Sequence, residues 1–277
     1  MTTWFITGVS RGLGFALAQA ALDRGDTVVG TVRTGAPDLK AGAGVLHLIT
    51  LDIADGAAVE RATTQAFELA GGRLDVLVNN AGYGLLGAIE DATDAEVERL
   101  FAVDVFGPFK LIRAALPWLR AQGSGHILNI TSIAGRAPGA GSGLYAAAKH
   151  ALEGLSASLA QEMAPLGIKV TAVAPGAFRT DFLSAHSIRK SDVAATGYEA
   201  SVGKVSQAFD AMAGQQLGDP ARAAQALLRI VDAPVPPTQL LLGSDALSRC
   251  RAKLDAVIEG IDEWEDLTRG TDFPKAA

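Results

Sequence analysis

A strand that runs through a glycine-rich turn into a helix begins this chain, and it constrains the fold more than any other feature. The apolar run Trp4–Ile6 leads into Thr7-Gly8-Val9-Ser10-Arg11-Gly12-Leu13-Gly14, and a helical pattern follows at once. Glycines allow a tight turn and a close approach of the backbone to a pyrophosphate, while a helix N-terminus offers free N–H groups to the anion. The place of the turn, between a strand and a helix, makes the pattern specific. The predicted phosphate-binding residues are Gly8, Ser10, Arg11, Gly12, Leu13 and Gly14.

Short apolar runs alternate with longer helical patterns along the rest of the chain. Strands are expected at Trp4–Ile6, Thr27–Val32, Val45–Leu51, Val76–Val78, Ile127–Thr131, Lys169–Ala174 and Gln239–Leu242. Helices are expected at Gly12–Asp23, Ala57–Ala70, Asp94–Ala121, Leu144–Ala164, Ala221–Val231 and Ala246–Leu267. Such alternation predicts βαβ crossovers, and strands rich in Val, Ile and Leu are typical of a sheet covered on both faces. We therefore predict an α/β fold, a single Rossmann-type domain over residues 1–277 with a doubly wound parallel sheet.

One segment interrupts this alternation. Asp181–Pro220 is rich in Ala, Ser and Gly, lacks a clean strand, and follows the sixth strand where a short connection is expected. An insertion of this length in a compact domain is usually a lid or a substrate-binding loop. A pair of ordinary surface helices is an equally good interpretation.

Composition and charge exclude several classes of function. The chain carries 24 Lys and Arg against 30 Asp and Glu, a net charge of −6, so neither a nucleic-acid nor a membrane partner is expected. Cys250 is the only cysteine, which predicts a reducing, cytoplasmic location. We expect no signal peptide and no membrane span, because the N-terminus begins directly with a strand and the apolar runs are short. No group of His, Cys and Asp residues has zinc-ligand spacing, so no metal site is predicted.

The second predicted strand bears on the choice of dinucleotide. NAD-binding proteins usually end this strand with an acidic residue that holds the ribose 2′-hydroxyl. Here the strand ends with Val32 and is followed by Arg33, while Arg11 lies within the glycine-rich turn. Two guanidinium groups suit a 2′-phosphate, so NADP(H) is the predicted cofactor, and NAD(H) stays open as the alternative.

We expect three residues in the middle of the chain to form an acid–base system. Tyr145 and Lys149 are four residues apart in a predicted helix and so share a face, and Ser132 follows the fifth strand. A free tyrosine has a pKa of about 10, and a neighbouring ammonium favours its ionised form. Tyr145 can then exchange a proton with an alcohol or alkoxide, and Ser132 can hydrogen-bond the same oxygen.

These motifs together resemble the short-chain dehydrogenase/reductase family. The motifs that carry the resemblance are the turn Thr7–Gly14, Asn79-Asn80-Ala81-Gly82, Ser132, Tyr145-Ala146-Ala147-Ala148-Lys149, and Pro175-Gly176 with the downstream Thr180. They occur in the family's order over residues 1–180. Beyond residue 220 the chain is similar to a subgroup with an added C-terminal helix, expected over about residues 246–267. The resemblance implies a nicotinamide-dependent oxidoreductase that acts on a carbonyl or alcohol carbon.

The resemblance also implies further cofactor contacts. Asp52 and Ile53 are expected beside the adenine, and Asn79, Ala81 and Gly82 along the ribose side. Pro175, Gly176 and Thr180 are expected around the nicotinamide carboxamide, and Tyr145 and Lys149 at the nicotinamide ribose.

One position departs from the family pattern. Many members place an Asn on the long helix before Ser132, where it helps to relay protons to the active-site Lys, whereas this chain has Asp104. An ionised carboxylate accepts hydrogen bonds but donates none, which puts the relay in doubt. Asp104 stays a catalytic candidate, either as a carboxylate that strengthens the local field at Lys149 or as a protonated side chain. The alternative is that Asp104 only stabilises a bend in the helix.

The expected substrate is a small apolar ketone, aldehyde or secondary alcohol. Its pocket walls are expected at Tyr83–Leu86, Ala134–Leu144 and Phe178–Gly218, where most side chains are small or apolar. His186, Arg136 and Arg189 are the polar candidates there. Two alternatives of other classes are an NADP(H)-sensing protein without turnover and an epimerase or dehydratase on the same scaffold. The first is expected to lack Tyr145 or Lys149, and the second needs a larger substrate region.

A homodimer is the predicted assembly. The helices expected at Asp94–Ala121 and Leu144–Ala164 carry apolar residues on more than one side, for example Phe106, Phe109 and Leu152. Family members often pair these helices across a two-fold axis.

Overall fold

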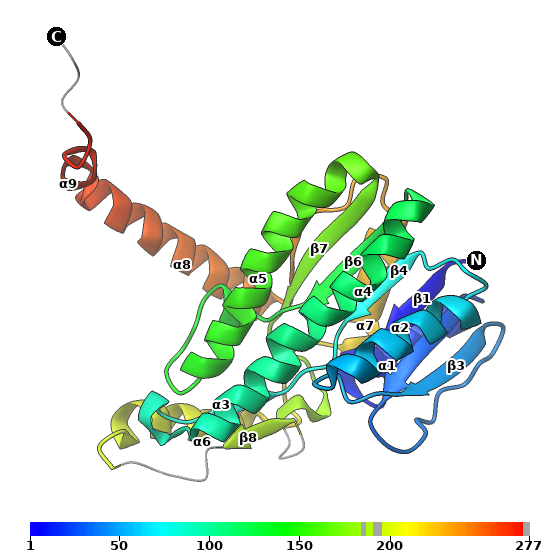
Figure 1. Cartoon of the computed structure of the whole chain (residues 1–277). Coiled ribbons are helices and arrows are strands. Elements are labelled where there is room, and N and C mark those ends of the chain that lie inside the picture. The colour runs from blue at the N-terminus through cyan, green and yellow to red at the C-terminus, as the bar shows by residue number, and fades with distance from the viewer. Residues whose placement is uncertain (184–186, 191–195, 274–277) are drawn as a thin grey trace.

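Seven parallel strands form the central sheet, in the order β3-β2-β1-β4-β6-β7-β9 (Figure 1). The computed structural model describes residues 1–183, 187–190 and 196–273. The strands of this sheet are β1 (Thr3–Ile6), β2 (Thr27–Val32), β3 (Val45–Thr50), β4 (Val76–Asn79), β6 (Gly125–Ile130), β7 (Ile168–Pro175) and β9 (Gln239–Leu242). Each predicted strand is confirmed, with ends within two residues. The strand order reverses between β1 and β4, and open sheets of this kind usually bind their ligands at such a point, in a crevice beyond the carboxyl ends of the strands.

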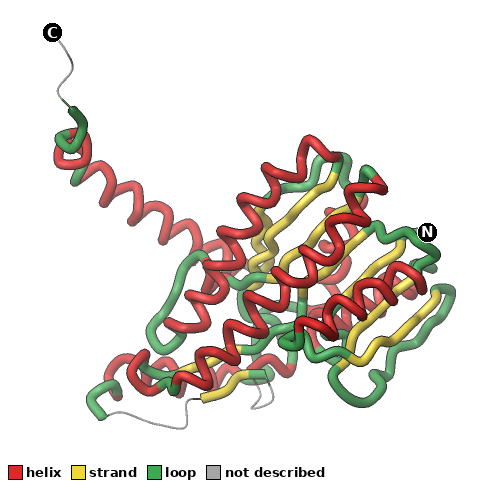
Figure 2. The backbone as a smooth tube through the Cα atoms, in the orientation of Figure 1, coloured by secondary structure: helices red, strands yellow, loops and turns green. Residues whose placement is uncertain are grey.

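Helices cover both faces of the sheet (Figure 2). One face carries α1 (Gly12–Asp23) and α7 (Pro220–Asp232), and the other carries α2 (Gly56–Leu69), α4 (Gly107–Gln122) and α5 (Gly143–Met163). Neighbouring residues of β1 point to opposite faces: Trp4 and Ile6 pack with α1 and α7, and Phe5 packs with α2, α4 and α5. Burial on both faces explains why the strands consist of apolar residues almost throughout.

The long helix predicted at Asp94–Ala121 is interrupted in its middle. It consists of α3 (Asp94–Phe101), a π-helical turn at Ala102–Phe106, and then α4. Pro108 has no N–H to donate to the carbonyl four residues earlier, which belongs to Asp104, and Gly107 bonds instead to the carbonyl of Ala102 five residues back. The turn therefore lies where the sequence departs from the family pattern, at Asp104.

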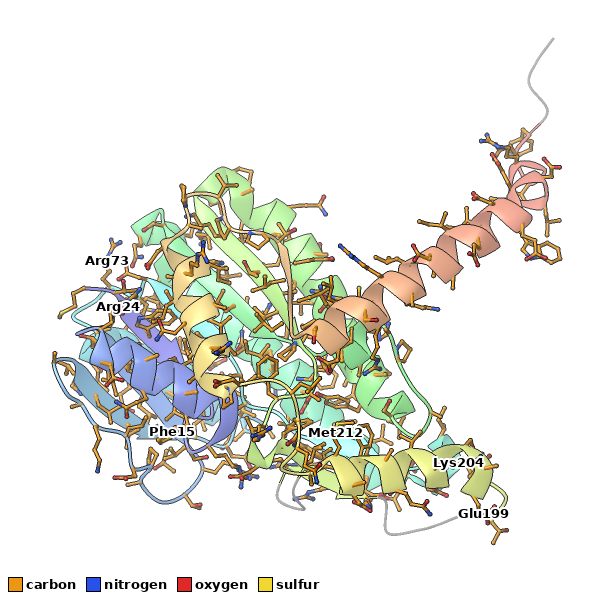
Figure 3. All side chains as sticks on the ribbon, turned by 180° about the vertical axis from the view of Figure 1, so that it is seen from behind. Phe15, Arg24, Arg73, Glu199, Lys204 and Met212 are labelled. Carbon is orange, nitrogen blue, oxygen red and sulfur yellow. The ribbon has the colours of Figure 1, made fainter. Side chains whose placement is uncertain are left out.

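The insertion at 181–220 contains a strand that the sequence analysis did not predict. β8 (Ile188–Lys190) pairs in parallel with β5 (Gly84–Leu86), which was also missed, and forms a separate two-stranded sheet. Strands of three residues are too short for a periodic pattern, so only their pairing identifies them. The segment also holds α6 (Lys204–Met212), whose ends are labelled in Figure 3. Residues 184–186 and 191–195 lie outside the described residues.

The C-terminal helix begins two residues earlier than predicted and ends sooner. It comprises α8 (Ser244–Glu263), followed by the short α9 (Glu265–Arg269). Figures 1 and 3 show α8 extending away from the body of the molecule beyond its first turns, which pack on that body.

Candidate active site

The glycine-rich turn at the carboxyl end of β1 has a shape that only glycine permits. Gly8 and Gly12 have φ angles of +74° and +64°, in the left-handed region. A Cβ on Gly14 would lie 2.3 Å from Nδ2 of Asn80 and 2.4 Å from the carbonyl oxygen of Gly8. The first turn of α1 starts within this segment, so its free N–H groups open toward the crevice. The residues present therefore fit the pyrophosphate of a dinucleotide.

Asn80 supports this turn from the end of β4, and the sequence analysis did not name it as a site residue. Its side-chain amide donates to the carbonyls of Thr7 and Gly8, at 2.9 and 3.0 Å. The hydroxyl of Thr7 in turn accepts the backbone N–H groups of Asn80 and Ala81, at 3.0 and 3.1 Å. The side chain of Asn79 faces into the protein and donates to Asn129 at 2.8 Å. Asn80 belongs to the Asn79–Gly82 motif, and this position was a signal that could have identified it as a site residue.

The end of β2 lies directly against the glycine-rich turn. Thr31 accepts the N–H of Gly8 on its hydroxyl at 3.1 Å and the N–H of Val9 on its carbonyl at 3.0 Å. Arg33 follows two residues later and is exposed, while Arg11 is half-buried within the turn. Both predicted arginines are therefore at the same end of the sheet as the turn.

Asp52, at the end of β3, is held in an ion pair. Its carboxylate lies 2.8 Å from the guanidinium of Arg99 and accepts the N–H of Ala54 at 3.0 Å. Burial alone would raise the pKa of Asp52, but the hydrogen bond from Arg99, followed by smaller contributions that include the charge of Arg33, lowers it. Ile53 beside it is buried against Gly107.

Ser132, Tyr145 and Lys149 meet at the carboxyl end of β6. Ser132 follows β6 in extended conformation and hydrogen-bonds the hydroxyl of Tyr145. Tyr145 and Lys149 lie one turn apart on α5, and both are buried. Nζ of Lys149 is 5.7 Å from the centroid of the Tyr145 ring and donates to the carbonyl of Ile130 at 3.2 Å. The three residues predicted from spacing thus form one cluster.

Asp104 completes this cluster from the π-helical turn. Its side chain is fully buried, with one oxygen 3.1 Å from Nζ of Lys149 and the other accepting the N–H of Tyr83 at 3.1 Å. Burial raises the pKa of Asp104, and the Lys149 ammonium and the Tyr83 N–H draw it back toward the ionised form. The carboxylate is therefore paired with Lys149, which argues against a role limited to a bend in the helix.

The pair changes the proton affinity of both groups on α5. Burial is the largest single influence and acts to lower the pKa of Lys149, but the charges of Asp104, Tyr145 and Glu153 and the hydrogen bond to Asp104 together outweigh it, so the pKa is raised. Burial also raises the pKa of Tyr145. Lys149 and the Ser132 hydrogen bond oppose this shift, whereas Asp104 adds to it. Tyr145 is therefore a protonated phenol at neutral pH in the protein without a bound cofactor.

The loop after β7 reaches the glycine-rich turn. A Cβ on Gly12 would lie 3.8 Å from Cβ of Thr180. A Cβ on Gly176 would lie 2.2 Å from the carboxylate of Asp245, which accepts the N–H of Ala177 at 2.8 Å. Thr180 therefore lies beside the glycine-rich turn, and the expected contacts of Pro175, Gly176 and Thr180 with the nicotinamide carboxamide stay a prediction.

The base of α8 holds two loops of the site, through residues that the sequence analysis missed. Asp245 binds the loop after β7, and Arg249 donates to the carbonyl of Ala137 at 2.6 Å. These contacts join residues 68 and 112 positions apart. No local pattern in the sequence carries a signal for them.

Apolar side chains surround Tyr145 on the side of the insertion. The Tyr145 and Phe182 rings are 6.1 Å apart, and Leu85, Ala134 and Leu144 belong to the same hydrophobic cluster. The guanidinium of Arg189 lies 5.4 Å from the centre of the Tyr83 ring at its rim. His186 lies outside the described residues.

Arg136 does not line this wall, so its assignment as a pocket residue was wrong. Its guanidinium forms an ion pair with Glu153 at 3.0 Å and donates to the carbonyl of Ala172 at 3.1 Å. Glu153 also accepts the hydroxyl proton of Thr131 at 2.5 Å. Arg136 therefore belongs to a buried network of polar contacts between α5 and β7.

Within the part of the chain that the structure describes, none of the helices combines the length and the apolar character needed to cross a bilayer. Over the same residues, no three His, Cys, Asp or Glu side chains gather as a metal site would require.

Comparisons with known proteins identify the family. A family model described as short chain dehydrogenase matches residues 2–190. Oxidoreductase BOA17 of Botryotinia fuckeliana is 35% identical over 271 residues, which cover 96% of this chain and 97% of that protein. A short-chain dehydrogenase from Streptomyces avermitilis superposes with a TM-score of 0.88 at 40% identity and covers 98% of this chain and 100% of its own. ElxO with NADP bound superposes with a TM-score of 0.74 at 27% identity, over 89% of this chain and 99% of its own.

These similarities cover the glycine-rich turn, the Ser132–Tyr145–Lys149 cluster and nearly the whole fold. The resemblance predicted from five short motifs is confirmed. The chain therefore belongs to the short-chain dehydrogenase/reductase family and is an NAD(P)-dependent oxidoreductase.

Proposed function

We propose that this protein interconverts an apolar secondary alcohol and the corresponding ketone, or an alcohol and an aldehyde, with NADP(H) and with Tyr145 as acid and base. The observation that carries the proposal is the cluster of Ser132 with the buried Tyr145 and Lys149 at the carboxyl end of β6. It lies next to a turn whose glycines fit a dinucleotide. A nicotinamide nucleotide, when bound, accepts or supplies the hydride.

Tyr145 exchanges the proton at the substrate oxygen. In reduction its hydroxyl donates a proton to that oxygen, and in oxidation its phenolate accepts one. Ser132 hydrogen-bonds the same oxygen and fixes its distance from Tyr145. The Lys149 ammonium stabilises the phenolate that forms, and it has donors left for the ribose hydroxyls of the cofactor.

Asp104 positions Lys149 and limits how far the Lys149 ammonium lowers the pKa of Tyr145. The carboxylate neutralises part of the ammonium charge, so Tyr145 keeps its proton to a higher pH than it would beside Lys149 alone. A phenol that is protonated at neutral pH is ready to act as an acid. Before the cofactor binds, Tyr145 is therefore in the protonation state that reduction of a carbonyl requires.

The cofactor would be held by residues on five loops and on α5. Those assigned to this role are Gly8, Ser10, Arg11, Gly12, Leu13, Gly14, Arg33, Asp52, Ile53, Asn79, Ala81, Gly82, Tyr145, Lys149, Pro175, Gly176 and Thr180. NADP(H) is favoured over NAD(H) because Arg11 and Arg33 lie at the end of β2 and the turn beside it, without an acidic residue at the strand end. The NADP bound to ElxO supports the same choice.

The apolar wall around Tyr145 supports a mainly apolar substrate. Phe182, Leu85 and Leu144 offer it hydrophobic contact, and Arg136 is turned away. The insertion, with β8 paired to β5, brings part of this wall to the site.

A homodimer and a reducing, cytoplasmic location complete the proposal. Phe106, Phe109 and Trp118 of the π-helical turn and α4 are 51%, 41% and 41% exposed, as expected of a face that pairs with a second copy. Leu152 of α5, which the sequence analysis gave as an example of the apolar residues available for pairing, is 1% exposed and therefore buried within its own chain. The only cysteine, Cys250, is buried and free.

A panel of ketones and aldehydes with NADPH or NADH tests the reaction class. We expect cofactor oxidation with apolar carbonyl compounds and a higher kcat/KM for NADPH. Binding of NADPH without turnover of any compound would instead favour the sensing alternative.

Arg33→Ala tests the cofactor choice. Loss of one charged hydrogen-bond donor to a phosphate should reduce the NADPH to NADH preference by about ten- to a hundredfold. Arg120→Ala, an exposed arginine at the end of α4, is the matched control and should leave the ratio unchanged. Equal use of both cofactors by the wild type would contradict the assignment.

A further inference from the structure

The outer part of α8 packs against no other element among the residues that the structure describes. Its base buries Ala246 and Cys250 against Ile133 and Ala137. From Arg251 to Phe273 every residue is exposed, and the views from both sides show α8 standing clear of the body (Figures 1 and 3). Most of the stability of a helix in a protein comes from packing of an apolar face, which this arm lacks in a single copy.

An apolar stripe runs along this arm with the spacing of a coiled coil. Large or apolar side chains recur at alternating intervals of three and four residues, at Leu247, Cys250, Leu254, Val257, Ile261 and Trp264, and all of them except Cys250, which is buried at the base, are exposed. Leu254 and Ile261 are 54% and 62% exposed. A stripe of this kind fits the seam between two helices better than a solvent-exposed surface.

The charges of α8 are divided between its two halves. The first half carries Arg249, Arg251 and Lys253, beside Asp245, whose carboxylate accepts the N–H of Ala177, and from Asp255 to Asp266 every charged residue is acidic. In a parallel pair of identical helices the acidic halves would face each other and repel. In an antiparallel pair the basic half of each helix faces the acidic half of the other.

A second copy of this chain is therefore the partner that the surface fits. We propose that α8 is an assembly arm that pairs in antiparallel orientation with α8 of a second copy. The acidic outer half makes an anionic membrane an unsuitable partner, since helices that lie on such membranes carry Lys and Arg on their polar face. This surface is separate from the face at Phe106, Phe109 and Trp118.

The arm also links assembly to the active site. Its first turns hold the loop at Ala177 through Asp245 and the loop at Ala137 through Arg249. A partner that fixes the arm thereby fixes the support of two site loops.

Light scattering on the full-length protein at micromolar concentration tests the pairing. The double variant Leu254→Ser/Ile261→Ser should halve the molar mass, whatever assembly the wild type forms through other faces. Val235→Ser removes an apolar side chain that is 89% exposed outside α8, and should leave the mass unchanged. An unchanged mass in the double variant, or a monomeric wild type, would overturn the proposal.

Disulfide cross-linking tests the orientation in a Cys250→Ala background. Val257→Cys, near the middle of α8, should cross-link to its counterpart in an antiparallel pair. Trp264→Cys, at the end, should not, because the two thiols would lie too far apart. Cross-linking at both positions would show a parallel pair and contradict the proposal. So would a wild-type monomer that co-sediments with vesicles of equimolar phosphatidylserine and phosphatidylcholine.

Discussion

The helices α5 and α8 have nearly the same length, 21 and 20 residues, but opposite environments. α5 packs against the sheet and buries Tyr145, Lys149 and Leu152, whereas α8 buries only Ala246 and Cys250. A helix enclosed by its own chain holds its side chains in one orientation, as proton transfer between fixed groups requires. A helix that its own chain leaves exposed keeps its apolar face for another molecule.

The comparison also separates two uses of charge. The buried pair of Lys149 and Asp104, 3.1 Å apart, acts on one neighbouring phenol in a place that water does not screen. The charges of α8 are exposed and spread along its length, so each contributes little alone. Their arrangement selects an orientation for a partner helix.

The largest expected effect comes from Tyr145→Phe on α5. The change removes only a hydroxyl, so turnover should fall by about 10²- to 10⁴-fold, the range of a general acid, while NADPH still binds. Steady-state kinetics and a fluorescence titration of the cofactor measure the two quantities. Tyr198→Phe removes the same group from an exposed tyrosine and is the control. An active Tyr145→Phe enzyme would refute the mechanism.

Leu152→Ala tests how firmly the body holds α5. Leu152 is 1% exposed, and loss of its side chain leaves a cavity, so the free energy of unfolding should fall by about 2–5 kcal/mol. Chemical denaturation followed by circular dichroism measures this change. A loss below about 1 kcal/mol would mean that the packing of α5 is looser than its burial implies.

Asp104→Asn and Asp104→Ala test the positioning role. Asparagine should keep most activity, and alanine should lose roughly ten- to a thousandfold. Asparagine also removes a negative charge that raises the pKa of Tyr145, so that pKa should fall. Oxidation needs the phenolate, so kcat for oxidation by Asp104→Asn should reach half its maximum at a lower pH than in the wild type. Reduction needs the phenol, so kcat for reduction should also begin to decline at a lower pH than in the wild type.

The measurement is kcat against pH in both directions, with thermal melts of each variant. If Asp104→Ala lowers the melting temperature but leaves kcat and its pH profile unchanged, Asp104 only stabilises the π-helical turn. If Asp104→Asn keeps the activity that Asp104→Ala loses, and if its pH profile is shifted, Asp104 positions Lys149 and does more than stabilise the π-helical turn.

The smallest expected effect on stability is that of Leu254→Ala on α8. This is the same substitution as Leu152→Ala, at a side chain that is 54% exposed. At dilutions where copies separate, it should change the free energy of unfolding by less than about 0.5 kcal/mol. A loss as large as that of Leu152→Ala under those conditions would show that the arm packs on its own body.

Local sequence signals determined the framework and the core of the site. Seven strands follow from apolar runs, the dinucleotide cradle from glycines between a strand and a helix, and the pairing of Tyr145 with Lys149 from a spacing of four in one helix. Each of these depends on residues close together in the chain. Periodicity and turn chemistry report such relations directly.

Only the tertiary structure decided the contacts between distant segments. Asn80 under the glycine-rich turn, Asp245 on the loop after β7 and Arg249 on Ala137 all lie far in sequence from what they bind. The packing of helices and strands against one another likewise decides three other features. These are the ion pair of Arg136 with Glu153, the pairing of β5 with β8, and the exposure of α8. A hydrogen bond across 112 residues leaves no periodic trace, because only the folded chain brings its donor and acceptor together.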